Sequence, residues 1–454
     1  MARIVAPPNW HQTITQNPQR WVELLALKPK LREQILELSD SKAGYLHWNK
    51  FRFKRPFPDE LSREEAWAII KAHRLSASKG LPFRAKGGQP INVCVTDPLH
   101  AVVRRITAHR KLVVAGLPEQ PSPQLQDDLK SYGLKALIDE AYYSAVIEGA
   151  VTTRKEARAI IRENRSPQTK SEKMIVNNYL AGLQMVEWAN EPMTPQRLCE
   201  IQAVLTRDTL ENEADSGQFR TELVYVRDDS RQEVVHTPPK AETIPERMED
   251  LCRFANYEND EDPIPTLVRA CLLHYQLAYD HPFGDGNGRA ARWLFLWRLL
   301  KCPEYWWVAM LSISRMTNHS KQDYYDAFLL AESDDFDATY LVRHQLAAME
   351  REMDRFAQFL TRRNALETHA RVQLRLEDGL NLRQLAVFDH VCTSNSATFT
   401  QRGHAQFHGV SQPTARKDLD SMVDNGLLLR IEGRPVVYKP AQRLIGAAKG
   451  FNYS

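Results

Sequence analysis

Twelve residues in the second half of the chain, 281–292, combine the side chains that phosphoryl or nucleotidyl transfer requires. Three glycines at every second position let backbone N–H groups converge on one anion, and the start of a helix adds its positive dipole end. Arg289 and Arg292 can bind the same anion with planar guanidinium groups. Asp285 is a hard oxygen ligand suited to magnesium, and His281 is a base that titrates near neutrality. The pattern therefore indicates a site for phosphate chemistry.

Two helices must position this loop. Residues 266–279 carry apolar side chains at helix spacing, and Pro282 ends that helix because its ring cannot continue the backbone hydrogen-bond ladder. A second apolar helix runs over residues 289–300. A lone Gly-x-Gly-x-Gly pattern would favour a simple interhelical turn with exposed arginines. The base, carboxylate, amide and two arginines within the same loop favour a functional site instead.

The loop resembles the signature of the Fic family, His-Pro-Phe-x-Asp-Gly-Asn-Gly-Arg-x-x-Arg, and every fixed position is present. Enzymes of that family bind ATP with magnesium and move AMP onto a Ser, Thr or Tyr hydroxyl of a target protein. The resemblance covers roughly the middle half of the chain. It implies a protein adenylyltransferase, with ATP and Mg²⁺ as cofactors and a hydroxyl-bearing protein, or the chain itself, as the target.

The resemblance also implies a role for each loop residue. His281 takes the proton from the incoming hydroxyl, which attacks the α-phosphate, and Asp285 holds the metal ion. The phosphate-binding residues are Gly286, Asn287 and Gly288 for the α- and β-phosphates, Arg289 for the β-phosphate and Arg292 for the γ-phosphate. A branch of the family that transfers phosphate has a degenerate loop, and the intact Asp285 and Gly286 argue against that branch.

A helical pattern over residues 125–149 ends in Ser144-Ala-Val-Ile-Glu148-Gly149. Ser144 and Glu148 are four residues apart and share one helical face, and Gly149 is a natural C-cap. Taken alone, Glu148 is a surface carboxylate. The string resembles the inhibitory motif Ser/Thr-x-x-x-Glu-Gly/Asn that some Fic proteins carry upstream of the catalytic loop. The resemblance implies that Glu148 pairs with Arg292 and so inhibits AMP transfer by its own chain. It is also compatible with Glu148 orienting a water molecule for the removal of AMP.

Residues 221–236 predict a β-hairpin, because short β-branched runs flank a polar turn. In Fic proteins the corresponding segment is a flap that pairs with the target backbone as an added strand. The residues that would dock the target are Leu223, Val224, Tyr225 and Val226. The family often places aromatic residues around the adenine ring near Tyr324 and Tyr325, for which core packing is the alternative.

Composition narrows the remaining possibilities. The chain has 454 residues, enough for two or three domains, and a formal charge of +3 that argues neither for nor against nucleic acid. No signal peptide opens it and no apolar run approaches membrane-spanning length, so a cytoplasmic protein without a membrane partner is expected. The six cysteines contain no Cys-x-x-Cys pair and indicate neither zinc nor a disulfide framework.

The first 120 residues carry no assignable chemistry. An amphipathic run covers residues 21–38, and residues 45–58 alternate aromatic and basic side chains. The second stretch predicts a strand or packed surface segment, with nucleic-acid stacking as the alternative. Residues 61–74 predict a helix with Ser62 as N-cap and Glu65 completing a capping box.

Residues 382–444 have a different organisation. Helical patterns over residues 383–391, 401–407 and 411–424 precede two β-like runs, and this order resembles a winged helix-turn-helix domain. The resemblance places Thr414, Arg416 and Lys417 on the recognition helix and Arg434 on the wing, as DNA contacts. Eight Lys or Arg against five Asp or Glu make residues 381–446 only mildly basic. Protein docking and dimerisation therefore stand beside DNA binding.

The expected fold is mainly α: an all-helical Fic core with a β-hairpin flap, followed by a winged helix-turn-helix domain. The expected divisions are an N-terminal region (1–120), the Fic domain (121–345), a connector helix (346–375) and the C-terminal domain (376–454). Two functions follow. The first is an autoinhibited adenylyltransferase, which could act as a homodimer. The second is a DNA-binding regulator whose Fic-like domain senses nucleotide.

Overall fold

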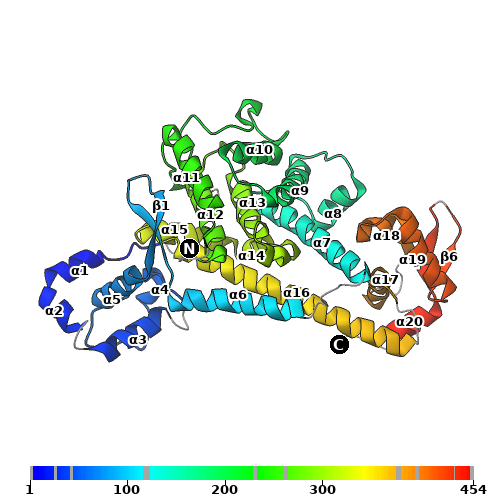
Figure 1. Ribbon diagram of the computed structural model, residues 1–454, viewed down its shortest axis with the longest axis horizontal. Helices are drawn as coiled ribbons and strands as arrows, with labels where there is room; N and C mark the ends of the chain where they lie inside the picture. Colours follow the sequence, from blue (N-terminus) through cyan, green and yellow to red (C-terminus); the bar gives the residue numbers. More distant parts are fainter. Residues whose placement is uncertain are drawn as a thin grey trace.

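The computed structural model describes residues 4–24, 28–40, 44–115, 123–228, 233–259, 264–374, 380–393, 398–433 and 435–449. This part of the chain is mostly helical, with three small antiparallel sheets, as the composition predicts. Figure 1 shows a layer of helices above a long lower helix, with smaller groups of elements at its two ends. None of the described helices has the length and apolar character needed to cross a membrane.

The N-terminal helices form a small group with its own apolar core. Their bounds are α1 (Trp10–Gln16), α2 (Pro18–Val22), α3 (Pro29–Ser39), α4 (Trp48–Phe51) and α5 (Arg63–Ser76). The capping box predicted at Ser62 and Glu65 is present at the start of α5. The amphipathic run 21–38 contributes to two helices, α2 and α3. The stretch 45–58 is packed, which was one of its predicted alternatives, but it contains a short helix instead of the predicted strand. In that helix Trp48 and Phe51 are buried against Trp67, so they are not free to stack on nucleic acid.

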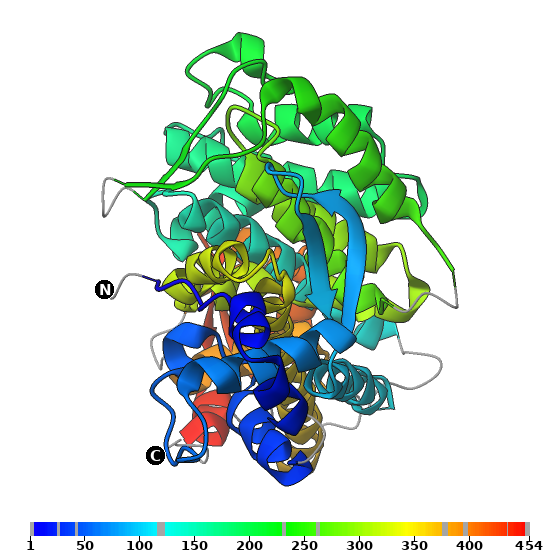
Figure 2. The same ribbon diagram turned by 90° about the vertical axis from the view of Figure 1, so that its left-hand side faces the viewer.

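A hairpin that the sequence did not predict connects this group to the rest. Strands β1 (Ser78–Arg84) and β2 (Pro90–Cys94) pair antiparallel, and Leu81, Phe83, Ile91 and Val93 belong to the same apolar core as the central helices. Figure 2 shows the hairpin upright behind the N-terminal helices. Helix α6 (Asp97–Ala115) then packs along the long lower helix α16 (Thr339–Leu374). The connector helix expected from residue 346 is present as part of α16, which begins earlier, at Thr339.

The upper layer consists of helices joined by short loops and one further hairpin. Its helices are α7 (Pro123–Ile147), α8 (Arg154–Glu163), α9 (Lys170–Glu187), α10 (Pro195–Thr206), α11 (Ile244–Asn256), α12 (Thr266–Asp280), α13 (Asn287–Leu300), α14 (Ile313–His319) and α15 (Lys321–Ser333), with the 3₁₀ helix η5 at Pro303–Met310. The hairpin consists of β3 (Val226–Asp228) and β4 (Glu233–His236). The expected boundary at residues 116–123 lies almost wholly outside the described residues.

Helices α12 and α13 form the centre of this layer. Nearly every side chain from Leu267 to Tyr279 and from Ala290 to Leu299 is buried, because α9, α10, α11 and α16 surround the pair. A helix that is buried on all sides needs no polar face, which explains the almost continuous apolar sequence of α13. The loop between these two helices is therefore held by two rigid elements.

The C-terminal elements form a separate apolar core around Leu419, Met422 and Tyr438. They are α17 (Leu382–Thr393), β5 (Phe399–Thr400), α18 (Gln401–His408), α19 (Gln412–Asp424), β6 (Leu428–Ile431), β7 (Val437–Pro440) and α20 (Gln442–Lys449). The strands form one sheet in the order β5-β7-β6. The three predicted helices and two predicted strands are present, and Ser411 caps α19 as expected. We call these elements the C-terminal module.

Buried histidines predict how folding stability depends on pH. Burial lowers the pKa of His47, His281 and His344 from 6.5 to about 4, so all three stay neutral in the folded chain at mildly acidic pH. The unfolded chain binds these protons at higher pH, so stability is lost as the pH falls from about 7 towards 4. Near pH 5 each of these histidines should lower the free energy of unfolding by about 2 kcal/mol relative to neutral pH.

We therefore expect the melting temperature to drop clearly between about pH 7.5 and pH 5, as measured by circular dichroism. In the matched variant His344→Gln, the same drop should be smaller, whatever its absolute stability. A melting temperature that stays level across this range would contradict the burial of these imidazoles.

Candidate active site

The loop between α12 and α13 contains two left-handed residues that shape it. His281 ends α12 with φ 48°, and Gly286 caps the start of α13 with φ 90°. A positive φ is costly for most side chains but open to glycine, which explains the glycine at position 286. The first backbone N–H groups of α13 lack partners within the helix and point into the loop. We call residues 284–288 and the first turn of α13 the anion cradle.

His281 has the properties of a neutral general base. Its Nδ1 lies 3.3 Å from the carbonyl oxygen of Ala278, which fixes the tautomer with the proton on Nδ1 and leaves Nε2 as the basic atom. Burial is the main reason why its pKa is lowered to about 4. The ring is therefore unprotonated at neutral pH and can accept a proton.

Side chains within the loop keep its shape. The amide of Asn287 accepts from Phe283 N at 2.9 Å and donates to Phe283 O at 2.8 Å. The predicted contact between Asn287 and phosphate stays a prediction, and in this state the side chain closes the loop. Arg289 is buried and donates to Leu205 O at 2.7 Å and to Asp285 at 3.1 Å, which ties the loop to α10.

Two residues outside the motif also hold the loop, and sequence reasoning missed both. Arg220 is buried and donates to the carbonyl oxygens of Glu222, Pro239, Asp280 and His281. Gln202 on α10 donates to Asp285 O at 3.2 Å and accepts from Gly217 N at 2.6 Å. Arg220 thus joins the base of the hairpin to the histidine's own carbonyl group.

The inhibitory motif predicted on α7 lies against the cradle. Nη2 of Arg292 is 2.7 Å from Oε1 of Glu148 and 3.1 Å from Ser144 O, and its Nε donates to Ser144 Oγ at 2.8 Å. A Cβ at Gly288 would collide with Oε1 of Glu148. The Glu148 carboxylate therefore occupies the first turn of α13, where a helix favours negative charge. Gly149 follows with φ 92°, as its C-cap position predicts.

Buried polar contacts hold α7 in this position. The Glu140 carboxylate is buried and accepts from Ser312 Oγ at 3.2 Å and from the backbone N and Oγ of Ser314 at 2.9 and 2.5 Å. Burial raises the pKa of Glu140, while the Ser314 contacts lower it. One turn of α7 before Ser144, Glu140 thus fixes the helix against the start of α14.

Asp285 is the single acidic residue of the loop, and its carboxylate is therefore the loop's candidate metal ligand. Its side chain is 48% exposed at the mouth of the cradle. Within the described residues, no group of three or more His, Cys, Asp or Glu side chains could hold a metal ion by itself. Magnesium carried by a polyphosphate needs only one or two protein carboxylates, so the donor set agrees with that ion.

The hairpin predicted at residues 221–236 is confirmed, with shifted strands. β3 begins at Val226 and includes the polar residues Arg227 and Asp228. Leu223, Val224 and Tyr225 precede the paired residues, and the side chains of Leu223 and Tyr225 are exposed. The turn at 229–232 lies outside the described residues. Exposed side chains next to a short strand are compatible with strand addition by a target.

The two candidate adenine residues differ in their surroundings. Tyr324 is buried, and its hydroxyl lies 2.8 Å from Nε2 of His274 in the core. Tyr325 is 40% exposed, and its hydroxyl donates to Ile147 O at 3.3 Å, beside Glu148. Tyr325 is therefore the one of the two that a ligand could contact in this state.

The DNA contacts predicted in the C-terminal module lie on α19, except Arg434, which is outside the described residues. Arg416 and Lys417 are exposed, and Thr414 is half-buried. Asp418 is buried and accepts from Arg383 Nε at 2.5 Å, so it faces the interior of the module. Asp420 accepts from Arg416 at 3.1 Å and from Tyr438 at 2.7 Å.

The loop, its neutral histidine and the helix N-terminus together form an arrangement that could bind phosphate and accept a proton. Comparison with known proteins bears on the same region: residues 192–299 match the model of the Fic/DOC family. That segment contains α10, the hairpin, α11, α12, the loop and nearly all of α13. The region that carries the candidate active site is therefore similar to Fic/DOC domains.

Individual relatives agree with this match. The "Protein adenylyltransferase Fic" of Nematostella vectensis is 30% identical over 179 residues, covering 36% of this chain and 39% of the relative. The protein of the same name from Drosophila ananassae is 28% identical over 165 residues, covering 35% and 31%. The chain thus spans less than half the length of these curated relatives.

A crystal structure of a Fic family protein from Desulfovibrio desulfuricans G20 is also similar, with 21% identity and a TM-score of 0.47. The match covers 75% of this chain and 96% of that chain.

Proposed function

We propose that this chain transfers AMP from ATP to a Ser, Thr or Tyr hydroxyl of a protein, or of the chain itself. The observation that carries the proposal is the neutral His281 beside an anion cradle whose second arginine is held by Glu148. The names of the matched relatives support the same activity. The segment 192–299 supplies most of the machinery, and Glu148 contributes from outside it.

In the proposed reaction, Nε2 of His281 accepts the proton of the incoming hydroxyl. The hydroxyl oxygen forms a bond to the α-phosphorus, and the bond from that phosphorus to the bridging oxygen breaks, releasing pyrophosphate. Backbone N–H groups at Gly286 and Gly288 bind the negative oxygens that carry the developing charge. Arg289 binds the β-phosphate, and Arg292 binds the γ-phosphate once Glu148 has left. Asp285 would hold Mg²⁺, which supplies charge neutralisation at the phosphates.

The inhibited state is the second part of the proposal. Arg292 is buried and pairs with Glu148, so the guanidinium group is not available to the γ-phosphate in this state. The Glu148 carboxylate also fills the place at Gly288 where phosphate oxygens would bind. The same carboxylate lies close enough to the cradle to orient a water molecule, so removal of AMP from a modified protein is a compatible second reaction.

A labelling experiment tests the reaction class. The chain is incubated with magnesium and a cell lysate, using ATP labelled on either the α- or the γ-phosphate. Label that reaches protein from the α-phosphate alone supports AMP transfer. Label from the γ-phosphate alone means kinase chemistry and overturns the proposal.

The expected divisions of the chain are retained as part of this proposal. The Fic domain (121–345) performs the reaction, the connector (346–375) continues α16, and the C-terminal domain (376–454) is a winged helix-turn-helix. The order of α17, α18 and α19, followed by the strands β6 and β7, supports this last assignment.

DNA binding through the C-terminal module is a second candidate function. Three aspartates on α19 weaken a DNA-binding reading of the sequence, yet Asp418 is buried and paired with Arg383. Asp418 therefore adds no negative charge to the exposed face of α19, where Arg416 and Lys417 lie. These cations support phosphate contacts.

We therefore expect salt-dependent DNA retardation by the full chain, weakened in Lys417→Gln with the salt slope reduced by about one. The control is Lys439→Gln, which removes an exposed lysine from β7 instead of from α19. Equal retardation by the parent, Lys417→Gln and Lys439→Gln would contradict DNA binding through α19. So would the absence of retardation at low salt.

A further inference from the structure

A cavity of about 350 Å³ lies where the C-terminal module meets the helices of the upper layer. On one side it is lined by α7, α8 and α9, and on the other by α18, the following turn and the start of α19. Small-molecule sites start at about this size. The cavity lies apart from the anion cradle, whose residues are not among its lining.

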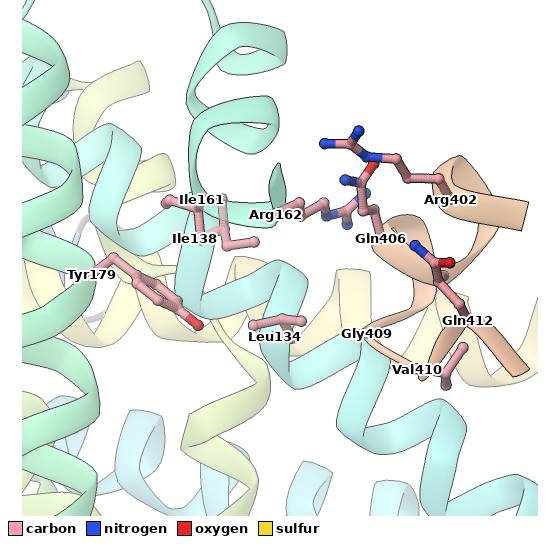
Figure 3. Close-up of a pocket in the computed structure, with 11 residues that line it drawn as sticks. Leu134, Ile138, Ile161, Arg162, Tyr179, Arg402, Gln406, Gly409, Val410 and Gln412 are labelled. Atoms are coloured by element: carbon pink, nitrogen blue, oxygen red, sulfur yellow. The ribbon is translucent and has the colours of Figure 1, made fainter. Parts of the chain in front are cut away.

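The lining divides into an apolar and a polar end, as Figure 3 shows. Leu134, Ile138 and Ile161 provide the apolar surface. Arg162 from α8 and Arg402 from α18 point toward one another at the polar end, with Gln406 beside them. The lining contains these two cations and no carboxylate.

Arg162 lacks the partners that a half-buried guanidinium group requires. Its Nε is buried without a hydrogen-bond partner among the described residues. Asp139, the carboxylate that favours its charge, already accepts from Arg154, Arg158 and Arg315. A buried donor without an acceptor is costly, and the neighbouring Arg158 adds repulsion.

Further basic side chains lie next to this cavity. Lys135 lies over the ring of Phe407 at 4.4 Å, and Arg162 lies over the same ring at 5.0 Å. Burial, followed by His404 and Lys135, lowers the pKa of His408 to about 2. A ligand that enters the cavity meets the positive charges of Arg162 and Arg402 and an apolar wall, while His408 stays neutral.

We propose that this cavity binds a small organic anion whose apolar body packs on Leu134, Ile138 and Ile161 and whose acidic group binds Arg162 and Arg402. An anionic group would accept from the free Nε of Arg162, and Arg402 would provide a second charge-assisted contact. Gln406 and the Tyr179 hydroxyl supply further polar contacts at the walls. The proposal does not depend on the proposed function, because the cavity lies outside the cradle.

Calorimetric titration of the full chain with phenyl phosphate tests this site. The unaltered chain should bind the probe saturably below about 10 mM. The double variant Arg162→Gln with Arg402→Gln should weaken this binding at least about tenfold, as expected for the loss of charge-assisted hydrogen bonds. The control variant Arg165→Gln, which alters an exposed arginine paired with Glu172 at the end of α8, should bind as the parent does.

A second variant separates this site from the anion cradle. Ala405→Phe places a ring in the cavity without changing charge, and it should weaken binding of the probe as well. Probe bound in the cradle would be insensitive to Arg162, Arg402 and Ala405. Binding that is unchanged in both variants, or no saturable binding to the parent, overturns the proposal.

Discussion

Replacing Glu148 with glycine should raise AMP transfer by about tenfold or more, because Arg292 becomes free to bind the γ-phosphate, and a gain of about 1.4 kcal/mol in transition-state binding is a factor of ten in rate. Glu148 contacts Arg292 at 2.7 Å and lies against Gly288, so one substitution frees a γ-phosphate ligand and empties the cradle. The side chain of Glu148 is 31% exposed, so its removal should leave the fold intact.

The measurement is incorporation of α-phosphate label into protein, at equal protein and ATP concentrations. Glu148→Gln keeps the shape but removes the charge, so it should give an intermediate gain. Glu211→Gly, at an exposed loop position, is the control for glycine substitution and should change nothing. Equal incorporation by Glu148→Gly and the parent would refute inhibition by this pair.

Replacing His281 with asparagine should reduce AMP transfer by about 10²–10⁴-fold, the range that a general base contributes. Asparagine is the sharper choice over alanine because position 281 has φ 48°, a conformation that asparagine tolerates well. The variant should therefore fold and bind ATP as its parent does. Its defect should be confined to the transfer step, where the proton of the hydroxyl needs an acceptor.

The experiment is best performed in the Glu148→Gly background, where activity is highest. ATP affinity, measured by calorimetry, should stay within about threefold of the parent, a change of under 1 kcal/mol. The melting temperature serves as the check on folding. Transfer that survives in Glu148→Gly with His281→Asn would exclude His281 as the base.

The loop and its helices were predictable because they follow from local rules. Pro282 ends α12, Gly286 permits the left-handed cap of α13, and the apolar spacing marks both helices. The capping box at Ser62 is equally local, since both of its contacts join residues three positions apart. Contact between Glu148 and Arg292 joins residues 144 positions apart, and it was predictable only through the family resemblance.

Residues that act through backbone carbonyl groups were not predictable. Arg220 donates to four carbonyl oxygens that belong to three separate segments of the chain. Every residue has a carbonyl group, so a sequence motif does not mark these acceptors. The β1–β2 hairpin was missed because Gly80 and Pro82 within β1 argue against a strand, whereas packing on the central core stabilises it. The burial of Asp418 was not predictable from the charge count, because a sequence does not show which side of a helix faces inward.

In the proposed mechanism Gly288 serves both substrate and inhibitor, since the bare backbone that admits the Glu148 carboxylate would also admit a phosphate oxygen. A side chain at this position would crowd both groups. Substitution of Gly288 should therefore not yield an unrestrained enzyme. A constitutively active descendant of this chain must instead arise by changes at Glu148, at Ser144 or in the seating of α7.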